Sequence, residues 1–152
     1  MRTKILMVCL GNICRSPLAE GILKSKLDPT KFEVNSAGTA GYHIGALPDT
    51  RSIAVAEKYN IDITDQSAMK FSPYHFEEFD HIYVMDTANY RDVIALALDD
   101  SEKEKVKLIL NELYPNKNTS VPDPYYGGNQ GFENIYQMLD LACDVIVKKL
   151  QA

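Results

Sequence analysis

The sequence has little cysteine, no excess of positive charge and no long apolar run. It holds three cysteines in 152 residues, whereas small secreted scaffolds held by disulfides are rich in cysteine. Its formal net charge is −5, although nucleic-acid-binding proteins usually show a basic excess or a basic stripe. No apolar stretch approaches the roughly 18 residues that a membrane-spanning helix needs. These absences favour a reduced, cytoplasmic protein with no membrane span and no nucleic-acid partner.

Length and periodicity predict a single α/β domain that spans residues 1–152. No internal repeat, low-complexity tract or linker divides the chain. Short apolar runs alternate with segments of helical spacing. The expected strands are 4–9, 32–36, 80–85 and 106–110, and the expected helices are 17–27, 49–59, 87–98 and 132–150. Such alternation predicts parallel strands joined by right-handed crossovers, with helices on both faces of the sheet, as in flavodoxin-like folds.

Two local features extend this prediction. Ser16 is the expected N-cap of the first helix, with Pro17 at the first helical position. The stretch 111–131 is rich in proline, glycine and asparagine, which predicts a long loop. A loop of that length in a compact domain is usually functional or disordered.

The loop after the first strand has the pattern of a phosphate cradle. Its sequence from residue 9 to residue 17 is CLGNICRSP, and ligands of such sheets bind beyond the carboxyl ends of the strands. Backbone N–H groups of the loop can converge at the helix start, where positive partial charge favours an anion. Arg15 can hold two phosphate oxygens with its planar fork, and Gly11 and Asn12 tolerate a tight backbone.

Cys9 is the candidate nucleophile of this loop. It would lie beneath the bound phosphorus, in a positive environment that favours the reactive thiolate, and its attack would give a cysteinyl-phosphate. Ser16 is placed to donate a hydrogen bond to the sulfur and so improve it as a leaving group. The alternative is structural: Cys9 buried at the end of a strand, and Arg15 on the surface.

The segment from Val8 to Pro17 resembles the signature loop of the low-molecular-weight protein tyrosine phosphatases. The likeness continues over nearly the whole chain in short motifs, which are Ala19-Glu20, Ser36-Ala37-Gly38, Gly41-Tyr42, Met85-Asp86 with Asn89, and Asp123-Pro124-Tyr125-Tyr126. It implies the phosphotyrosine phosphatase I-like fold, a four-stranded parallel sheet flanked by helices. It also implies metal-independent hydrolysis of phosphotyrosine in protein substrates, without a cofactor. Separately, we expect the protein to be a monomer, although the sequence does not determine its oligomeric state.

The resemblance assigns a role to Asp123 and to the rest of the loop. Asp123 would protonate the leaving phenolate and later deprotonate the attacking water. The remaining phosphate-binding residues would be Leu10, Gly11, Asn12, Ile13, Cys14 and Ser16. From the residues alone, a turn residue between two prolines is the slightly favoured interpretation of Asp123, and the resemblance reverses it.

Further residues would shape the pocket. The resemblance implies that Tyr42, Tyr125 and Tyr126 form a slot deep enough to select phosphotyrosine over phosphoserine. It also implies that Asn12, Ser36 and Asn89 hydrogen-bond the phosphate loop into shape. The alternatives are half-buried packing for the tyrosines and ordinary turn or cap roles for the others.

Two features bear on how the site is supported and regulated. In the family, the stretch after Ile63 usually carries a histidine and an arginine, but residues 64–68 read TDQSA here. A histidine that supports the loop is therefore absent or replaced. The family also implies that Cys14 can join Cys9 reversibly and so shield it from irreversible oxidation. Cys143 belongs to the apolar stripe of the last helix and is expected to be inert.

Four rival functions are weighed against this hypothesis. Arsenate reductases of this fold need extra cysteines for a disulfide relay, and none lies between Cys14 and Cys143. Arginine phosphatases of this fold typically carry threonine where this chain has Ile13, and they lack the pair Tyr125-Tyr126. A binding module without activity could lose Cys9 or Asp123, yet both are present. A flavodoxin-like cofactor carrier is an option on fold alone.

Overall fold

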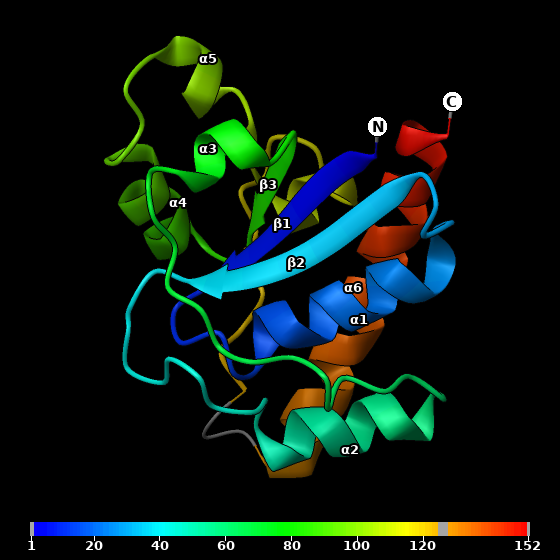
Figure 1. Cartoon of the computed structure of the whole chain (residues 1–152). Coiled ribbons are helices and arrows are strands. Elements are labelled where there is room, and N and C mark those ends of the chain that lie inside the picture. Colours follow the sequence, from blue (N-terminus) through cyan, green and yellow to red (C-terminus); the bar gives the residue numbers. More distant parts are fainter. Residues whose placement is uncertain (1, 125–127, 152) are drawn as a thin grey trace.

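A four-stranded parallel sheet forms the centre of the structure, a computed structural model that describes residues 2–124 and 128–151 (Figure 1). The strands are β1 (Thr3–Cys9), β2 (Phe32–Gly38), β3 (His81–Val84) and β4 (Val106–Leu108), in the order β2-β1-β3-β4. All three strand pairs are parallel. β1 is fully buried from Ile5 to Cys9, because an inner strand covered on both faces must be apolar on both.

Helices cover both faces of this sheet (Figure 1). On one face lie α1 (Arg15–Lys26), α2 (Thr50–Lys58), the 3-10 helix η1 (Ile109–Glu112) and α6 (Gly128–Leu150), which pack with Ile5 and Met7 of β1. On the other face lie α3 (His75–Glu78) and α4 (Thr87–Ile94), which pack with Leu6 and Val8. The alternation of β1 side chains thus divides the core into two layers. The predicted α/β fold is confirmed.

The strand order puts the functional loop at the switch point of the sheet. β1 lies between β2 and β3, so the chain leaves the C-terminal end of β1 where the strand order reverses. In open sheets of this type a crevice forms at that point. The loop from Leu10 to Cys14 lies there and leads directly into α1.

Several local predictions were wrong. Cys14, not Ser16, is the N-cap of α1, because the helix already begins at Arg15. The Ser16 hydroxyl instead contacts the Cys9 sulfur. The segment 111–131 is no single loop, since η1 enters it and α6 begins at Gly128. The fourth strand ends at Leu108, where Ile109 and Leu110 turn into η1 and enter the core. The short helices α3 and α5 (Asp100–Lys103) were not expected.

Helix lengths and compositions also bear on the membrane question. Within residues 2–124 and 128–151, no helix combines the length and the apolar character needed to cross a membrane.

Candidate active site

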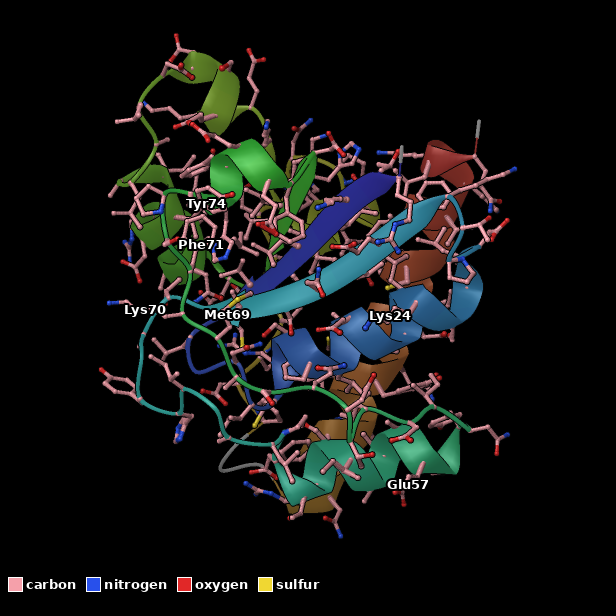
Figure 2. All side chains as sticks on the ribbon, viewed as in Figure 1. Lys24, Glu57, Met69, Lys70, Phe71 and Tyr74 are labelled. Atoms are coloured by element: carbon pink, nitrogen blue, oxygen red, sulfur yellow. The ribbon has the colours of Figure 1, made fainter. Side chains whose placement is uncertain are left out.

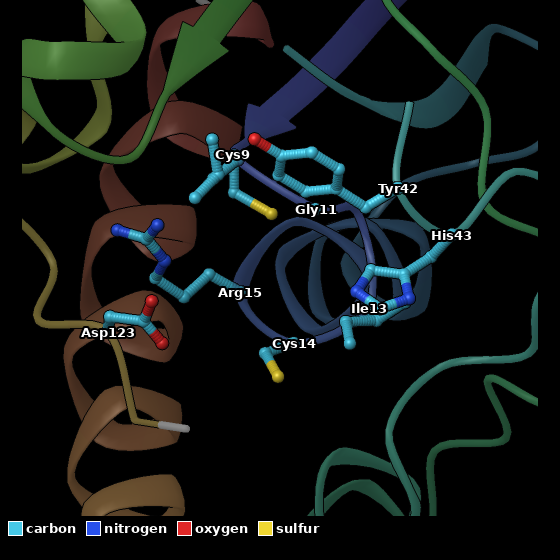
Figure 3. A pocket seen from close by; sticks show the side chains of 9 residues that line it. Cys9, Gly11, Ile13, Cys14, Arg15, Tyr42, His43 and Asp123 are labelled. Carbon is cyan, nitrogen blue, oxygen red and sulfur yellow. The ribbon is translucent and has the colours of Figure 1, made fainter. Parts of the chain in front are cut away.

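A pocket of about 350 Å³ opens at the C-terminal end of β1 (Figure 3). Cys9 lines it from the end of that strand, and the loop before α1 adds Leu10, Gly11, Ile13 and Cys14. Tyr42 and His43 line it from the segment after β2, and Asp123 from the segment before α6. Three stretches that are far apart in the sequence therefore meet at one pocket.

The Cys9 sulfur is held by the first turn of α1. Cys9 is only 3% exposed, and its Sγ lies 3.0 Å from the Ser16 hydroxyl. The Asn12 amide donates to that hydroxyl at 2.8 Å. Because the Ser16 oxygen accepts from Asn12, its own proton can point toward the sulfur. The predicted contact between Ser16 and the sulfur is present.

Asn12 fixes the shape of the loop in a left-handed conformation. Its φ is 57°, a conformation that asparagine tolerates better than most residues. Its amide also donates to the Ser36 hydroxyl at 3.0 Å, and its carbonyl oxygen accepts from the Met69 backbone N–H at 2.8 Å. The Ser36 hydroxyl in turn donates to Glu20 at 2.6 Å. Asn12 and Ser36 thus lie where the resemblance implied.

The end of β2 supports the loop from below. The backbone N–H groups of Thr39 and Ala40 donate to the carbonyls of Cys9 and Leu10, each at 2.9 Å. A β-carbon at Gly38 would lie 2.7 Å from the Leu10 carbonyl oxygen, closer than real contacts allow. Glycine is required there because the loop passes directly over the strand end.

Arg15 is buried and held on one side. It is 3% exposed, and its Nη1 donates to Asp86 at 2.7 Å and to the Val121 carbonyl at 3.0 Å. Asp86 follows β3, and its other oxygen accepts from the Asn89 N–H at 2.7 Å to cap α4. Sequence reasoning placed Asp86 in a family motif but did not predict its contact with Arg15. The signal for this contact was the position of Asp86 directly after β3, because β3 pairs with β1 and both strands end at the same edge of the sheet.

Two buried polar residues, one in α1 and one packed against it, were given no role by the sequence. Glu20 is 4% exposed, and burial raises the pKa of its carboxyl although Lys24 and Ser36 hydrogen-bond to it. Gln66 lies in the stretch that departs from the family pattern, and its amide donates to the Pro17 carbonyl at 3.0 Å. Gln66 therefore supports the first turn of α1 from the stretch where the family usually carries a histidine and an arginine.

Cys14 lies in the same pocket as Cys9 but in a different electrostatic setting. Burial is the main cause that raises the pKa of Cys14 to about 12, and the nearby Asp49 and Cys9 add to the effect. Cys9, Cys14 and Cys143 are all unpaired thiols. Burial also raises the pKa of Cys143, which lies in the core as predicted.

The three tyrosines expected to form the pocket walls stay a prediction, although Tyr42 does lie at the pocket. Tyr42 lines the mouth and is 77% exposed, while Tyr125 and Tyr126 lie outside the described residues. His43 was not predicted as a lining residue; its ring packs over Gly11 (Figure 3). Asn89 is buried, but its side-chain oxygen has no hydrogen-bond partner among the described residues, so its support of the loop stays a prediction.

Metal-binding side chains do not gather in the described part of the chain. Within it, no group of three or more histidine, cysteine, aspartate or glutamate side chains could hold an ion.

Comparison with known proteins places this pocket in a family. The family model described as "Low molecular weight phosphotyrosine protein phosphatase" matches residues 4–152. A low molecular weight phosphotyrosine protein phosphatase of Schizosaccharomyces pombe is 37% identical over 145 residues, which cover 91% of this chain and 92% of the relative. The chain therefore belongs to the low molecular weight phosphotyrosine protein phosphatase family.

Solved structures agree with this assignment. A protein tyrosine phosphatase of Entamoeba histolytica, with Hepes in its active site, matches with a TM-score of 0.91 and 35% identity over 98% of this chain and 97% of that one. Wzb of Vibrio vulnificus in complex with benzylphosphonate matches with a TM-score of 0.87 and 30% identity over 98% and 99%. Both the fold and the sequence thus support the family.

Proposed function

We propose that this protein, as one catalytic domain of residues 1–152, hydrolyses phosphotyrosine in protein substrates through a phosphoryl group carried by Cys9. The observation that carries the proposal is the meeting of Cys9, Arg15 and Asp123 in one pocket (Figure 3). These are a nucleophile, a phosphate clamp and a carboxyl group; the first two belong to the loop between β1 and α1, and the third comes from the segment before α6. The benzylphosphonate held by the Vibrio relative is chemically similar to a phosphate monoester of a phenol.

Binding begins with the phosphate dianion. Backbone N–H groups of the loop from Leu10 to Arg15 converge on it at the start of α1, where the helix contributes positive partial charge. Arg15 uses Nη1 for Asp86 and Val121, so the other N–H groups of its planar fork are turned to two phosphate oxygens. The net charge of the chain is −5, so this attraction is local.

In the first chemical step the Cys9 thiolate attacks phosphorus. A sulfur–phosphorus bond forms, the bond from phosphorus to the tyrosyl oxygen breaks, and Asp123 gives its proton to that oxygen. Charge on the transferring group is stabilised by Arg15 and the loop N–H groups. Tyrosine then leaves with its hydroxyl restored.

In the second step water removes the phosphoryl group. Asp123, now a carboxylate, takes a proton from the water as its oxygen attacks phosphorus. The sulfur–phosphorus bond breaks, and the thiolate that leaves is stabilised by the Ser16 hydroxyl at 3.0 Å. Phosphate is released, and Asp123 again carries the proton that the next cycle needs.

The depth of the pocket explains why phosphotyrosine is selected over phosphoserine. Cys9 lies at the buried end of the pocket, while Tyr42 stands at the mouth. A phosphotyrosine ring spans that distance, whereas the short side chain of phosphoserine leaves its phosphate away from the sulfur. Ile13, in place of the threonine typical of arginine phosphatases, lines the wall and favours the aromatic ring.

The test compares three substrates. Wild type and the Cys9→Ser variant are assayed with p-nitrophenyl phosphate, phosphotyrosine and phosphoarginine. We expect hydrolysis of the first two by wild type and none by the variant. A preference for phosphoarginine would replace the proposed substrate, and equal activity of the variant would remove Cys9 from the mechanism.

The proposal includes a cytoplasmic monomer that acts on phosphoproteins without nucleic acid. The acidic net charge of −5 supports the expectation that nucleic acid is not a partner. Sedimentation equilibrium of the wild type tests the oligomeric state, and a dimer at micromolar concentration would contradict it.

A further inference from the structure

Exposed apolar side chains gather beside the mouth of the pocket. Residues 41–47, here named the rim segment, contain Tyr42, Ile44 and Leu47, which are 77%, 66% and 59% exposed. Single exposed apolar residues are ordinary, but several together mark an interaction surface when they adjoin a binding pocket. Neither the chemistry of the pocket nor the packing of the core explains Ile44 and Leu47.

The rim segment is anchored, so this exposure is not the result of a loose loop. The Gly45 N–H donates to the Ala68 carbonyl, and the Ala68 N–H donates to the Ala46 carbonyl, each at 2.8 Å. Just beyond the segment, the Asp49 N–H donates to the Ile13 carbonyl of the phosphate loop at 2.7 Å. The segment is thus fixed to the loop that holds the phosphate, and its side chains are preorganised for contact.

The rim segment is continuous with the pocket. Tyr42 and His43 line the pocket itself, and the His43 ring packs over Gly11 of the phosphate loop (Figure 3). A phosphotyrosine that reaches Cys9 leaves its own backbone at the mouth. The residues next to it in the substrate must therefore pass over the rim.

The charges around the mouth do not favour an acidic substrate segment. Among the described residues that line the pocket, Arg15 is buried against Asp86, and Asp123 adds a carboxyl group. Arg51 is paired with Asp49 at 3.1 Å. Lys70, whose side chain lies beside Gly41 and Ile44, is the cation nearest to the rim segment in these contacts. Lys70 is exposed and lies at the surface of the molecule (Figure 2). It is a single cation, and Asp123 at the pocket carries the opposite charge.

We propose that the rim segment, through Ile44 and Leu47, selects phosphotyrosine flanked by apolar side chains. The occupant is the substrate chain itself, and the inference rests on the proposed function. Burial of an aliphatic side chain against Ile44 or Leu47 removes apolar surface of both partners from water, which favours the complex. The gain belongs to substrate binding, so it is expected in KM and in kcat/KM rather than in kcat.

The test uses three phosphotyrosine peptides of equal length that differ in the two residues on each side of the phosphotyrosine. These residues are leucine in the first, asparagine in the second and glutamate in the third. Leucine and asparagine are similar in size and uncharged, so their ratio reports apolar contact alone. Wild type is expected to prefer the leucine peptide over the asparagine peptide about tenfold in kcat/KM, and this ratio should not change with salt.

The variant Ile44→Ser/Leu47→Ser should reduce that ratio to about twofold or less while p-nitrophenyl phosphate, which has no flanking residues, is hydrolysed as before. Leu98→Ser is the matched control, since Leu98 is 86% exposed and lies after α4, outside the rim segment; it should keep the wild-type ratio. Equal rates on the leucine and asparagine peptides, or a preference for glutamate that persists at high salt, would overturn the inference. Absence of p-nitrophenyl phosphate hydrolysis in wild type would instead overturn the proposed function.

Discussion

Asp86 is the residue that determines how Arg15 faces the phosphate. One of its oxygens accepts from Arg15 at 2.7 Å, while the other caps α4. Asp86→Asn keeps a side-chain oxygen for the cap. It places the NH2 group of the amide, which cannot accept a hydrogen bond, opposite the Arg15 guanidinium. Loss of one charged hydrogen bond corresponds to roughly tenfold or more in binding. We therefore expect KM for p-nitrophenyl phosphate, and the inhibition constant of inorganic phosphate, to rise by about that factor.

The control for this change is Asp92→Asn, which removes the same charge from an exposed position of α4. It should leave both constants as they are in wild type. If Asp86→Asn has the same inhibition constant for phosphate as wild type, Asp86 serves only as a helix cap, and its hydrogen bond to Arg15 does not contribute to phosphate binding.

Cys14 is expected to react slowly with alkylating agents. Its pKa is raised to about 12 from an ordinary 9.0, mainly by burial, so its thiolate becomes abundant only as the pH approaches 12. At neutral pH the thiolate is then about 1,000-fold rarer than in the unfolded chain. Iodoacetamide labelling at pH 7.5, read by peptide mass, should modify Cys14 far more slowly in native protein than in urea. Equal labelling rates would contradict the raised pKa.

This behaviour fits the redox role that the family resemblance implies. A thiol that stays protonated is not oxidised first, so Cys9 would form the sulfenic acid and Cys14 would resolve it. The pairing of Cys9 with Cys14 stays a prediction. Loss of two hydrogens from the intact mass after mild peroxide treatment, abolished in Cys14→Ser, is the result it requires.

At the scale of elements, the phosphate loop depends on both the conformation and the hydrogen bonds of Asn12. Asn12→Ala loses three side-chain hydrogen bonds and places an ordinary residue at φ 57°. Asn12→Gly loses the same bonds but accepts that φ. We expect both variants to lose stability, about 1–3 kcal/mol for the bonds, and the alanine variant to be about 1 kcal/mol worse.

Urea denaturation and kcat/KM measured on the two variants separate these effects. The glycine variant should retain more activity at the same temperature, because its loop can still adopt the cradle. If the alanine variant proves as stable as the glycine variant, the left-handed conformation at position 12 does not contribute to the stability of the loop.

Strands and long helices could be predicted from the sequence, but several boundaries and the short elements could not. β1 and α6 carry apolar patterns of six or more residues, and such patterns determine their type. The single turns α3 and α5 have four residues each, too few for a period to be visible. The end of β4 at Leu108 is set by the packing of Ile109 and Leu110 under α6, which is a tertiary effect.

At the scale of the whole molecule, the active site is assembled by the sheet order. The chemistry of Cys9 and Arg15 could be predicted because both belong to one local motif. The contact of Arg15 with Asp86 and with the Val121 carbonyl joins positions 71 and 106 residues away, and no local pattern encodes such a distance. The same holds for His43, which reaches the pocket only because the chain returns along β2.

The same view explains why an acidic protein can take an anionic substrate. The net charge of −5 opposes the approach of phosphate, so the affinity must arise from a few N–H groups and one guanidinium in a small enclosed space. Those groups are fixed by the ends of β1, β2 and β3 together. The fold as a whole, rather than its surface charge, thus creates the phosphate site.

The phosphoryl group on Cys9 is the central intermediate of the mechanism, and trapping that group is the most direct test. Asp123→Ala should still transfer phosphate from p-nitrophenyl phosphate, whose leaving group needs little protonation, but it should hydrolyse the intermediate about 100-fold more slowly or worse. Acid quenching during turnover, followed by peptide mass analysis, should then find one added phosphoryl group on Cys9. A phosphoryl group on another residue, or turnover without any phosphorylated protein, would contradict the mechanism.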